Sequence, residues 1–469
     1  MSHKDKITVA GTGFVGLITA AVFADRGFSA VALDVDQKKV DKVNKGETFF
    51  FEPNLDLLVS RVVNKSKNLV ASTDILNSYK TSNVTFICVG TPSQEDGSCD
   101  LQYIEQVAKD LGTVIANKDE YHLVIVKSTV VPGTTRNLVK KTIEETSGKI
   151  AGKDFGLCMN PEFLREGQSI YDTVFPDRII IGEIDSKAGE KLESLFRTLY
   201  ADTKDQFAKQ WKDVYNKDVS CPEILRTTLE TAECIKYANN SFLATKISFI
   251  NQFANICERI DGVDINTVAK GIGLDFRINP NFLRAGAGFG GSCFPKDVKA
   301  ILHFARGKQY EPILLADVLK VNDRQAQRMV ELAEEKLGSL KNKTVTILGL
   351  SFKPDTDDMR SAPSIKIINE LLSKGANVVA WDPKAIEEAK KEHYIGEKIT
   401  YAQSIETAIK AADVCLLITE WQDFKDLKPK DFKLMKKPIL IDGRRIYEAK
   451  EFLKEGIEYL GIGLGPIID

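Results

Sequence analysis

A glycine-rich turn near the start of the chain constrains the fold more than any other feature. Gly11, Gly13 and Gly16 follow the apolar run ITVA and open the alanine-rich segment FVGLITAAVFAD. This spacing needs glycine for a tight turn, for close approach of the backbone to a pyrophosphate, and for packing of a helix against a strand. The amides and partial positive charge of the helix N-terminus favour an anion. The pattern predicts a strand, a nucleotide-binding turn and a helix.

Asp34 makes this prediction more specific. It ends the apolar run AVALD and follows Gly16 by 18 residues. A carboxylate at this place accepts hydrogen bonds from both ribose hydroxyls and repels a 2′-phosphate, which favours NAD over NADP. Lys39 either neutralises a phosphate or is a solvated helix residue, and the sequence does not decide between the two.

The rest of the chain alternates apolar runs with amphipathic segments. Through about the first 220 residues this alternation predicts a parallel sheet covered by helices on both faces. A second α/β pattern begins at KNKTVTILGLSF without the full glycine set, so it is expected to bind something other than a dinucleotide. Between them, residues 223–261 contain neither Gly nor Pro and span about 58 Å if helical throughout.

We therefore expect an α/β fold. Two Rossmann-like, doubly wound parallel-sheet domains are joined by a central helical domain with one long helix. The expected boundaries are 1–220, 221–337 and 338–469.

Composition excludes several classes of partner. The chain has 469 residues, with 64 Lys plus Arg against 66 Asp plus Glu, and a formal net charge of −2. Without a basic stripe it is not expected to bind nucleic acid. No apolar run reaches the roughly 18 residues that span a bilayer, and the N-terminus enters a strand pattern without a signal peptide. We expect no membrane contact, a cytoplasmic location and, from the apolar content of the long helix, a homodimer or higher homo-oligomer.

The cysteines do not indicate a metal. All eight are widely spaced, none forms a CxxC pair, and only four histidines accompany them. No metal site is expected. Cys88 and Cys415 lie in apolar runs typical of strand cores, whereas Cys293 lies in GFGGSCFPKD, with glycines at 286, 288, 290 and 291. These glycines are expected to leave the backbone open to a ligand.

Cys293 is the candidate nucleophile. A helix that begins near Pro295, together with Lys296, would lower the pKa of the thiol and favour the thiolate. The alternative is a small buried cysteine in a glycine turn. A nicotinamide beside a nucleophilic cysteine suggests that the thiolate adds to an aldehyde, the adduct gives hydride to NAD, and the thioester is hydrolysed to an acid.

Other polar residues are placed to assist this chemistry. Lys236 and Asn240 are one helical turn apart and together are able to stabilise an oxyanion. A further set follows strand-like runs, at the edge where open parallel sheets bind ligands: Ser128, Thr129, Glu162 and Glu166. Each of these residues alone is also explained as a cap, a turn or a surface charge.

Five motifs together resemble the UDP-glucose 6-dehydrogenase family within the nucleotide-sugar dehydrogenases: GFGGSCFPKD, NPEFLREG, KSTVVPGTT, AECIKYANNSFLATKISFIN and GLSFKPDTDDMRSAP. The resemblance covers essentially the whole chain. It implies oxidation of UDP-glucose to UDP-glucuronate with two NAD and one water, through an aldehyde and a thioester. The alternatives are a dehydrogenase of GDP-mannose or a UDP-N-acetylhexosamine, a hydroxyacid or 6-phosphogluconate dehydrogenase that makes one oxidation, and an NAD-responsive regulatory protein.

The resemblance also implies catalytic roles. Cys293 is the nucleophile, and Lys236 and Asn240 stabilise developing charge on oxygen. Glu162 acts through water as general base. The residues that hold this water and the lysine are Asp297 and Thr129.

Binding residues follow from the same resemblance. For NAD it points to Gly11, Gly13, Phe14, Val15, Gly16, Asp34, Lys39, Thr91, Thr129, Glu166, Lys296 and Arg360. For the sugar nucleotide it points to Glu162, Phe163, Leu164, Arg165, Glu166, Lys236, Asn240, Arg277, Phe282, Leu283, Arg284, Phe289, Gly290, Cys293, Phe352, Lys353 and Arg444. Arg277 is expected to reach a neighbouring subunit, and the choice of Arg444 over Arg445 is open. The segment 203–222 is longer and more polar than the family's usual link, and the sequence assigns it no role.

Overall fold

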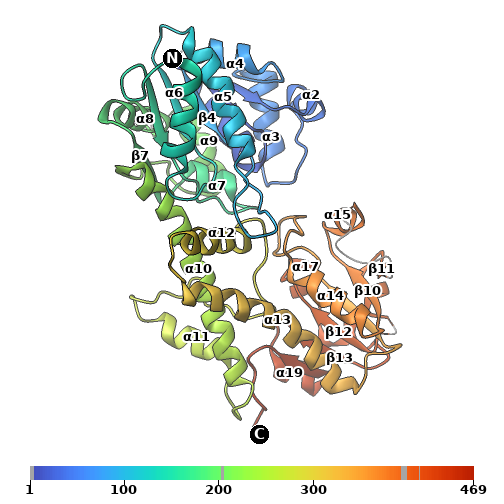
Figure 1. Cartoon of the computed structure of the whole chain (residues 1–469). Coiled ribbons are helices and arrows are strands. Elements are labelled where there is room, and N and C mark those ends of the chain that lie inside the picture. The colour runs from blue at the N-terminus through green and yellow to red at the C-terminus, as the bar shows by residue number, and fades with distance from the viewer. Residues whose placement is uncertain (1–4, 202–204, 392–398, 411, 469) are drawn as a thin grey trace. The chain divides into compact units, whose positions relative to one another are not determined.

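The chain forms two compact units. The computed structural model describes residues 5–201, 205–391, 399–410 and 412–468. The units are Met1–Ala238 and Asn239–Asp469, and each is built around one sheet (Figure 1). Helix α10 (Leu229–Cys257) belongs in part to each unit. In the described part of the chain, no helix combines the length and the apolar character needed to cross a membrane.

The sheet of the first unit has eight strands in the order β3-β2-β1-β4-β5-β6-β7-β8. Neighbouring strands pair in parallel except β6 and β7, which run antiparallel. The order 3-2-1-4-5-6 is that of dinucleotide-binding sheets, whose ligands bind where the order reverses, between β1 and β4. The strands are β1 (Lys6–Ala10), β2 (Ser29–Leu33), β3 (Leu69–Ser72), β4 (Val84–Ile87), β5 (His122–Val126), β6 (Phe155–Met159), β7 (Arg178–Glu183) and β8 (Glu223–Thr228).

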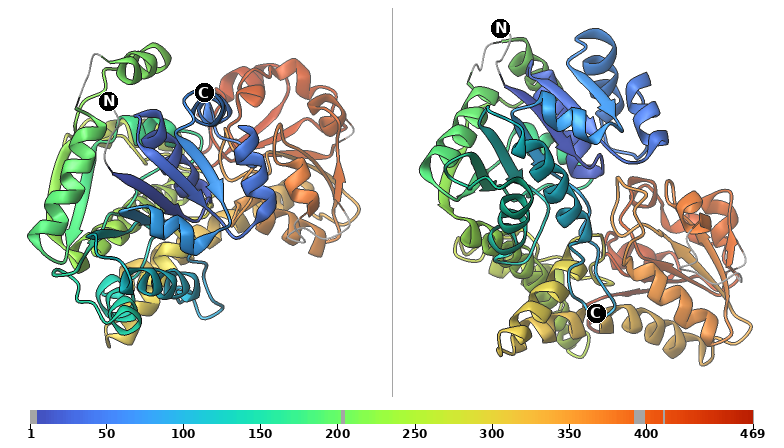
Figure 2. Two further views of the ribbon diagram at one scale, coloured as in Figure 1. Left: turned by 90° about the horizontal axis from the view of Figure 1, so that it is seen from above. Right: turned by 45° about the horizontal axis from the view of Figure 1, so that its top comes forward.

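Helices cover both faces of this sheet, as the two further views in Figure 2 show. Alternate residues of each strand point into two separate cores, so that Val9 and Phe86 pack with one set of helices and Val124 and Leu157 with the other. The first core is covered by α1 (Phe14–Asp25), α2 (Gln37–Lys45), α3 (Leu55–Ser60), the π-helical turn η1 (Arg61–Lys65), α7 (Ser169–Val174), α8 (Ser186–Leu199) and α9 (Gln206–Tyr215). The second is covered by α4 (Ile75–Thr81), α5 (Gln102–Ala116), the π-helical turn η2 (Thr135–Lys140) and α6 (Lys141–Ser147).

The long helix is shorter than the absence of Gly and Pro predicts. Glu223–Thr228 forms strand β8, which pairs in parallel with β7. The β-branched residues Ile224, Thr227 and Thr228 favour this extended chain. The 29 residues of α10 then span about 43 Å. A helix throughout 223–261 is therefore wrong at both ends, because a segment without Gly and Pro permits a helix but does not exclude a strand.

The polar segment 203–222 contains a docked helix; its residues 203 and 204 lie outside the described part of the chain. Trp211 of α9 is buried, and its indole donates to the Asp25 carboxylate at 2.9 Å. The guanidinium of Arg61 lies 5.5 Å from the centre of the indole ring. Tyr215 packs edge-on against Tyr171 of α7. The segment is thus part of the first unit's core and not a loose link.

The second unit combines helices with a six-stranded parallel sheet in the order β11-β10-β9-β12-β13-β14, which again reads 3-2-1-4-5-6. Its first helices after α10 are α11 (Ile265–Gly273), α12 (Phe294–Gly307) and α13 (Ile313–Leu337). The strands are β9 (Thr344–Leu348), β10 (Asn377–Trp381), β11 (Ile399–Tyr401), β12 (Val414–Leu417), β13 (Ile439–Asp442) and β14 (Glu458–Gly461). The remaining helices are α14 (Pro363–Ser373), α15 (Ile386–Lys391), α16 (Ile405–Ile409), α17 (Gln422–Lys425), α18 (Pro429–Phe432) and α19 (Ala449–Lys454). The predicted class, α/β with two Rossmann-like sheets and a helical region between them in sequence, is confirmed.

Candidate active site

The glycine turn after β1 has the backbone shape that its sequence predicts. Gly11 has φ of +91°, and its amide donates to the Leu33 carbonyl at 2.8 Å. A Cβ on Gly16 would lie 1.8 Å from the Gly11 carbonyl oxygen, so the packing of α1 against the turn requires this glycine. A Cβ on Gly13, the N-cap of α1, would meet no atom within 4 Å. Gly13 therefore leaves the start of α1, with Phe14, open to a diphosphate.

Asp34 follows β2 directly and is held beside this turn. One carboxylate oxygen accepts the amide of Thr12 at 2.9 Å and its hydroxyl at 2.5 Å, and the other accepts the amide of Asp36 at 3.0 Å. Burial opposes ionisation, but these hydrogen bonds outweigh it and lower the pKa of Asp34. Lys39 lies 3.9 Å from the carboxylate, with its ammonium 5.4 Å from the Phe49 ring centre. An ionised, half-buried carboxylate here fits the ribose hydroxyls of NAD.

Two further predicted cofactor residues are brought together at the carboxyl ends of β4 and β5. The hydroxyl of Thr91 donates to the carbonyl of Thr129 at 2.9 Å. Ser128 donates to the carbonyls of Ile87 and Val89, at 3.2 and 2.7 Å. The two loops are thus tied together next to the switch point between β1 and β4.

Glu162 and Lys236 form a buried ion pair within the first unit. The ammonium of Lys236 donates to the carboxylate and to the main-chain carbonyl of Glu162, both at 2.7 Å. The amide of Leu164 donates to the other carboxylate oxygen at 2.6 Å. Burial acts to raise the pKa of Glu162, but the charge of Lys236 and these hydrogen bonds outweigh it and lower this pKa. Glu162 is therefore a carboxylate at neutral pH.

The rest of NPEFLREG surrounds this pair. The ring of Phe163 lies 4.0 Å from the guanidinium carbon of Arg178 and 5.5 Å from the ammonium of Lys236. Arg165 is exposed and forms an ion pair with Asp172 at 2.6 Å. Glu166 lies in the same loop, and α7 begins at Ser169.

Two buried carboxylates near these loops were not predicted. Glu233, one turn before Lys236 on α10, accepts the amides of Gly133 and Thr135 at 2.5 and 2.7 Å. Burial raises the pKa of Glu233 to about 6. Glu52 accepts the amides of Gly167 and Ser169 at 2.7 and 2.6 Å. The signal in the sequence was an acidic residue among apolar neighbours. Both carboxylates accept backbone amides from segments that lie next to predicted site residues.

Cys293 is the N-cap of α12, as predicted from Pro295, and its thiol is partly exposed. Ser292 places its hydroxyl 3.5 Å from the Cys293 sulfur. Asp297 in the first turn of α12 is buried; it accepts the side-chain amide of Asn240 at 2.7 Å and the ammonium of Lys296 at 2.6 Å. The second unit therefore brings together the predicted nucleophile and three of its predicted neighbours.

At three of the glycines around Cys293, protein atoms fill the space that a side chain would need, while the predicted approach of a ligand to the backbone stays a prediction. A Cβ on Gly286 would lie 2.5 Å from the Gly443 carbonyl oxygen, and one on Gly290 would lie 2.4 Å from that of Ser361. Gly291 has φ of +87°, and a Cβ there would lie 2.8 Å from the Phe352 ring. These glycines are needed because later parts of the chain pack directly on the Cys293 loop. The amide of Gly291 also donates to the Arg360 carbonyl at 2.8 Å.

The predicted substrate cations fall into two groups. Arg284 and Arg444 lie on either side of Glu420, at 3.4 and 3.5 Å from its carboxylate. Arg277 and Arg360 are exposed and paired with acids two residues away, Asp275 and Asp358. The choice between Arg444 and Arg445 as the substrate residue now favours Arg444. The side chain of Arg445 is buried in an ion pair with Asp264 at 2.8 Å and donates to the Ile462 carbonyl.

The remaining predicted substrate residues line the Cys293 loop and its neighbours. The ring centre of Phe294 lies 6.2 Å from that of Phe282 and 5.9 Å from that of Phe289. Leu283, which follows Phe282 in the sequence, is buried. The ammonium of Lys353 lies 5.6 Å from the Phe352 ring. These residues all belong to the second unit. Their roles in substrate binding stay predictions.

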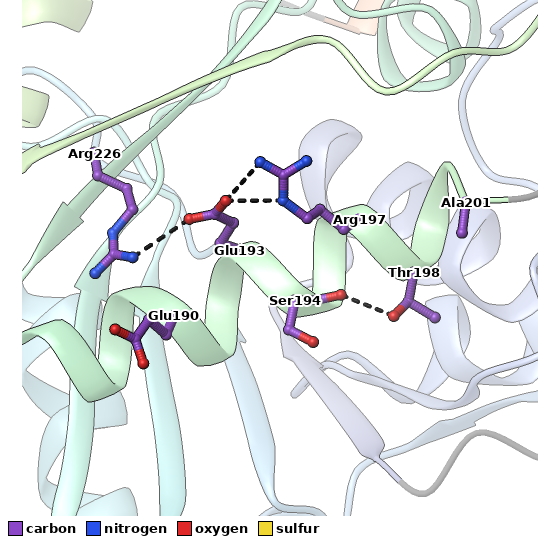
Figure 3. A pocket seen from close by; sticks show the side chains of 7 residues that line it. All are labelled: Glu190, Glu193, Ser194, Arg197, Thr198, Ala201 and Arg226. Atoms are coloured by element: carbon purple, nitrogen blue, oxygen red, sulfur yellow. Dashed lines mark hydrogen bonds and ion pairs between the residues drawn. The ribbon is translucent and has the colours of Figure 1, made fainter.

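A surface hollow of about 530 Å³ in the first unit contains none of the predicted residues (Figure 3). Three of its charges are paired with one another: Glu193 of α8 accepts from Arg197 and Arg226, which approach it from opposite sides. The lining residues are Glu190, Glu193, Ser194, Arg197, Thr198, Ala201 and Arg226. Within the described ranges, no cluster of three His, Cys, Asp or Glu side chains is arranged to hold a metal ion.

The strand order, the open glycine turn and Asp34 define an NAD-binding domain, and the matching family models and relatives make the chain an NAD-dependent oxidoreductase. Family models agree along the chain. The NAD binding domain of the UDP-glucose/GDP-mannose dehydrogenase family matches residues 5–200, its central domain 230–324 and its UDP binding domain 346–449. The chain belongs to this family, and its cofactor is NAD.

Individual relatives are similar over nearly their whole length. The UDP-glucose 6-dehydrogenase AglM of Haloferax volcanii is 41% identical over 454 residues, which cover 97% of this chain and 99% of that protein. The structure of a UDP-glucose dehydrogenase from Pyrobaculum islandicum is similar with a TM-score of 0.88 and 35% identity, covering 99% and 98% of the two chains. A UDP-D-ManNAc dehydrogenase structure from Pyrococcus horikoshii is similar with a TM-score of 0.82 and 27% identity, covering 98% and 99%.

The contact at Gly290 gives a first prediction. Gly290→Ala should displace the Cys293 loop, because the new methyl group would lie 2.4 Å from the Ser361 carbonyl oxygen. We expect steady-state NADH production from a nucleotide sugar to fall by about 100-fold or more, as small displacements of reacting groups do. Gly307→Ala is the matched control, since a Cβ at this residue of α12 meets no atom within 4 Å. Equal activity of the two variants would contradict the packing argument.

Proposed function

We propose that this enzyme oxidises UDP-glucose to UDP-glucuronate, using two NAD and one water, through intermediates bound to Cys293. The observation that carries the proposal is the place of Cys293, a partly exposed thiol at the N-cap of α12 with Lys296 in the first turn. The positive end of a helix favours a thiolate, and the charge of Lys296 balances the buried Asp297 carboxylate in the same turn. A dehydrogenase that makes a single oxidation gives this thiol no function.

The proposed reaction consists of two oxidations at C6 of the sugar and one hydrolysis. The C6 alcohol loses a proton and a hydride to become an aldehyde. The Cys293 thiolate adds to the aldehyde carbon, and the oxygen takes a proton to give a thiohemiacetal. Loss of a second hydride and proton gives a thioester, which water cleaves to the carboxylate and the free thiol. NAD held at the glycine turn supplies the hydride acceptor for both oxidations.

The polar residues take distinct roles in this proposal. Lys236 and Asn240 donate hydrogen bonds to the substrate oxygen as negative charge develops on it. Glu162 is ionised and accepts a proton from the attacking water. Asp297 holds Asn240 in place, and its buried carboxylate is balanced by Lys296. Thr129, tied to Thr91, belongs to the loop that positions water and cofactor.

The sugar nucleotide is proposed to bind to the second unit. A diphosphate rewards cations that donate in a fork, and Arg284 and Arg444 supply two such groups. Their partner Glu420 keeps the guanidinium groups in place. UDP-glucose is chosen because the relatives of highest identity described above carry that substrate in their names. The second candidate, a UDP-N-acetylhexosamine, is favoured only by the more distant similarity to the Pyrococcus horikoshii enzyme.

We also propose that the enzyme is a homodimer or a higher homo-oligomer. Helix α10 and the residues just after it expose an apolar stripe with spacings of 7, 4, 3 and 4 residues: Phe242, Phe249, Phe253, Ile256 and Ile260. A continuous exposed stripe of this kind suits an identical helix from a second copy. Phe276, which is 91% exposed beside Arg277, supports the proposal that this arginine reaches a neighbouring subunit.

Domain boundaries and location complete the proposal. We propose three domains, expected at 1–220, 221–337 and 338–469, because the three family models match separate parts of the chain. The first boundary is moved past β8 (Glu223–Thr228), because this strand belongs to the first sheet. We retain a cytoplasmic location because all eight cysteines, each of which the structure describes, are free thiols.

The function is tested by counting NADH. Purified enzyme is given a limiting amount of UDP-glucose, GDP-mannose, UDP-N-acetylglucosamine or UDP-N-acetylmannosamine with excess NAD. We expect two NADH per UDP-glucose, because both oxidations occur before product release. One NADH per UDP-glucose indicates a single oxidation, and preference for another sugar nucleotide overturns the choice of substrate.

Cys293→Ser tests the covalent mechanism. A serine hydroxyl is a much weaker nucleophile than a thiolate, so steady-state NADH production should disappear. Binding of NAD should stay within about twofold of wild type, because Cys293 is not proposed to bind the cofactor. Cys221→Ser, which changes an exposed cysteine of the first unit, is the control and should retain activity. Undiminished turnover of Cys293→Ser excludes the thioester.

The apolar stripe predicts the state of association. Sedimentation velocity of the wild type should give a dimer or larger species, and the double variant Phe249→Glu, Phe253→Glu should be smaller, since buried unpaired carboxylates oppose association. Leu434→Glu, an exposed apolar residue elsewhere in the second unit, should leave the association state unchanged. A monomeric wild type would refute the proposal.

A further inference from the structure

Lys127 occupies a position at the active-site edge of the first sheet that the proposed mechanism does not use. It follows β5 directly and is partly buried. Its ammonium donates to the side-chain oxygen of Asn160 at 2.9 Å. Asn160 follows β6 directly and begins the segment that leads to Glu162. Lys127 thus joins the ends of two neighbouring strands at the start of the Glu162 loop.

Three hydrogen bonds hold Asn160 in place. It is buried, its side-chain NH2 donates to the Ile180 carbonyl of β7 at 2.8 Å, and its main-chain amide donates to the Val126 carbonyl of β5 at 2.8 Å. With the side-chain oxygen bound to Lys127, both ends of the amide group are engaged. The side chain is therefore fixed in orientation, and the chain leaves β6 toward Glu162 in one direction.

The charges around Glu162 come from two elements of the first unit. Lys236 of α10 is bonded to it, and the positive charge of Lys127 after β5 also acts to lower the pKa of Glu162. Cys88, which follows β4, is another titratable group that interacts electrostatically with Lys127; burial raises the pKa of its thiol to about 12, so this thiol is uncharged at neutral pH. Burial lowers the pKa of Lys127 itself, and the negative charge of Glu162 opposes this effect.

We propose that Lys127 is a positioning residue for the proposed reaction: it fixes the Glu162 loop through Asn160 and provides a second positive charge beside the Glu162 carboxylate. The need for a second charge follows from the proposed role of Lys236, on which this inference rests. When Lys236 turns a hydrogen bond toward the substrate oxygen, its bond to Glu162 weakens. Lys127 then keeps the carboxylate ionised and in place to accept the proton of the attacking water.

The test is the pH dependence of kcat with UDP-glucose and NAD, measured on the full-length enzyme. Lys127→Met removes charge and hydrogen bond, Lys127→Gln keeps a donor for Asn160 and removes the charge, and Lys127→Arg keeps both. Loss of the charge should raise the pKa of Glu162, so the acid limb of the profile should move to higher pH by about 1 unit or more in the Met and Gln variants. The Arg variant should restore the wild-type limb, and Gln should retain more activity than Met at high pH.

Lys118→Met is the matched control. Lys118 precedes β5, at the opposite end of the strand, and its ammonium bonds the carbonyls of Tyr79 and Ser82. Burial lowers the pKa of Lys118 as it lowers that of Lys127. Lys118→Met and Lys127→Met therefore each remove a partly buried ammonium group together with its hydrogen bonds. The control should leave the acid limb where it is in wild type. Thermal melting and NAD binding identify the folded variants, and Lys127→Gln carries the test if the Met variant does not fold.

The outcomes separate the two proposals. A wild type that yields two NADH per UDP-glucose, with an unmoved acid limb in Lys127→Gln, contradicts the role of Lys127 alone. An equal shift in Lys118→Met contradicts it as well, because the effect is then general to buried lysines. A wild type that yields one NADH contradicts the proposed function itself, together with the role of Lys127 that depends on it.

Discussion

Burial of polar groups along one face of α10 is the constraint on which the candidate active site depends. Glu233, Lys236 and Asn240 recur at intervals of three and four residues and therefore share a face of the helix. Charged or polar groups removed from water are costly unless each finds a partner. Glu233 finds two amides, Lys236 finds Glu162, and Asn240 finds Asp297. Satisfying these three side chains decides which loops pack against the helix, and those loops carry the proposed chemistry.

The two sheets share a strand order but use its acidic position differently. Asp34 follows the second strand of the first sheet, and its ionised carboxylate stands beside an open helix N-terminus. Asp382 follows the second strand of the other sheet, where it accepts the amides of Leu350 and Ser351 and the indole of Trp421. Asp382 is buried, and its other carboxylate oxygen accepts the amides of Lys384 and Ala385, whereas Asp34, which also accepts protein hydrogen bonds, stays partly exposed and open to a ribose. The same topology therefore supports NAD in one unit and calls for another mode of binding in the other.

Local sequence patterns were sufficient for the features that depend on neighbouring residues. The glycine turn, Asp34 after β2 and the start of α12 near Pro295 were all predictable, because each is fixed by geometry within a few residues. The features that depend on distant chain segments were not. Strand β8 exists because β7 offers it a pairing edge, and the glycines before Cys293 are needed because Ser361 and Gly443 approach them.

The same distinction explains the residues that sequence reasoning left out. Lys127 stands beside the two residues, Ser128 and Thr129, that the motif singled out, but only the fold reveals that its ammonium reaches Asn160. Arg445 and Arg444 are equivalent as letters in a sequence. Burial of Arg445 against Asp264, far away in the chain, identifies it as structural.

The Gly291 amide and the Arg360 carbonyl link the nucleophile's loop to the chain that follows β9. Cys293, the proposed nucleophile, thus lies on a segment whose backbone is packed against residues some 70 positions downstream. A polypeptide truncated after the central helices would lose the part that matches the family's UDP binding domain, and with it Ser361 and Phe352, which pack on the backbone just before Cys293.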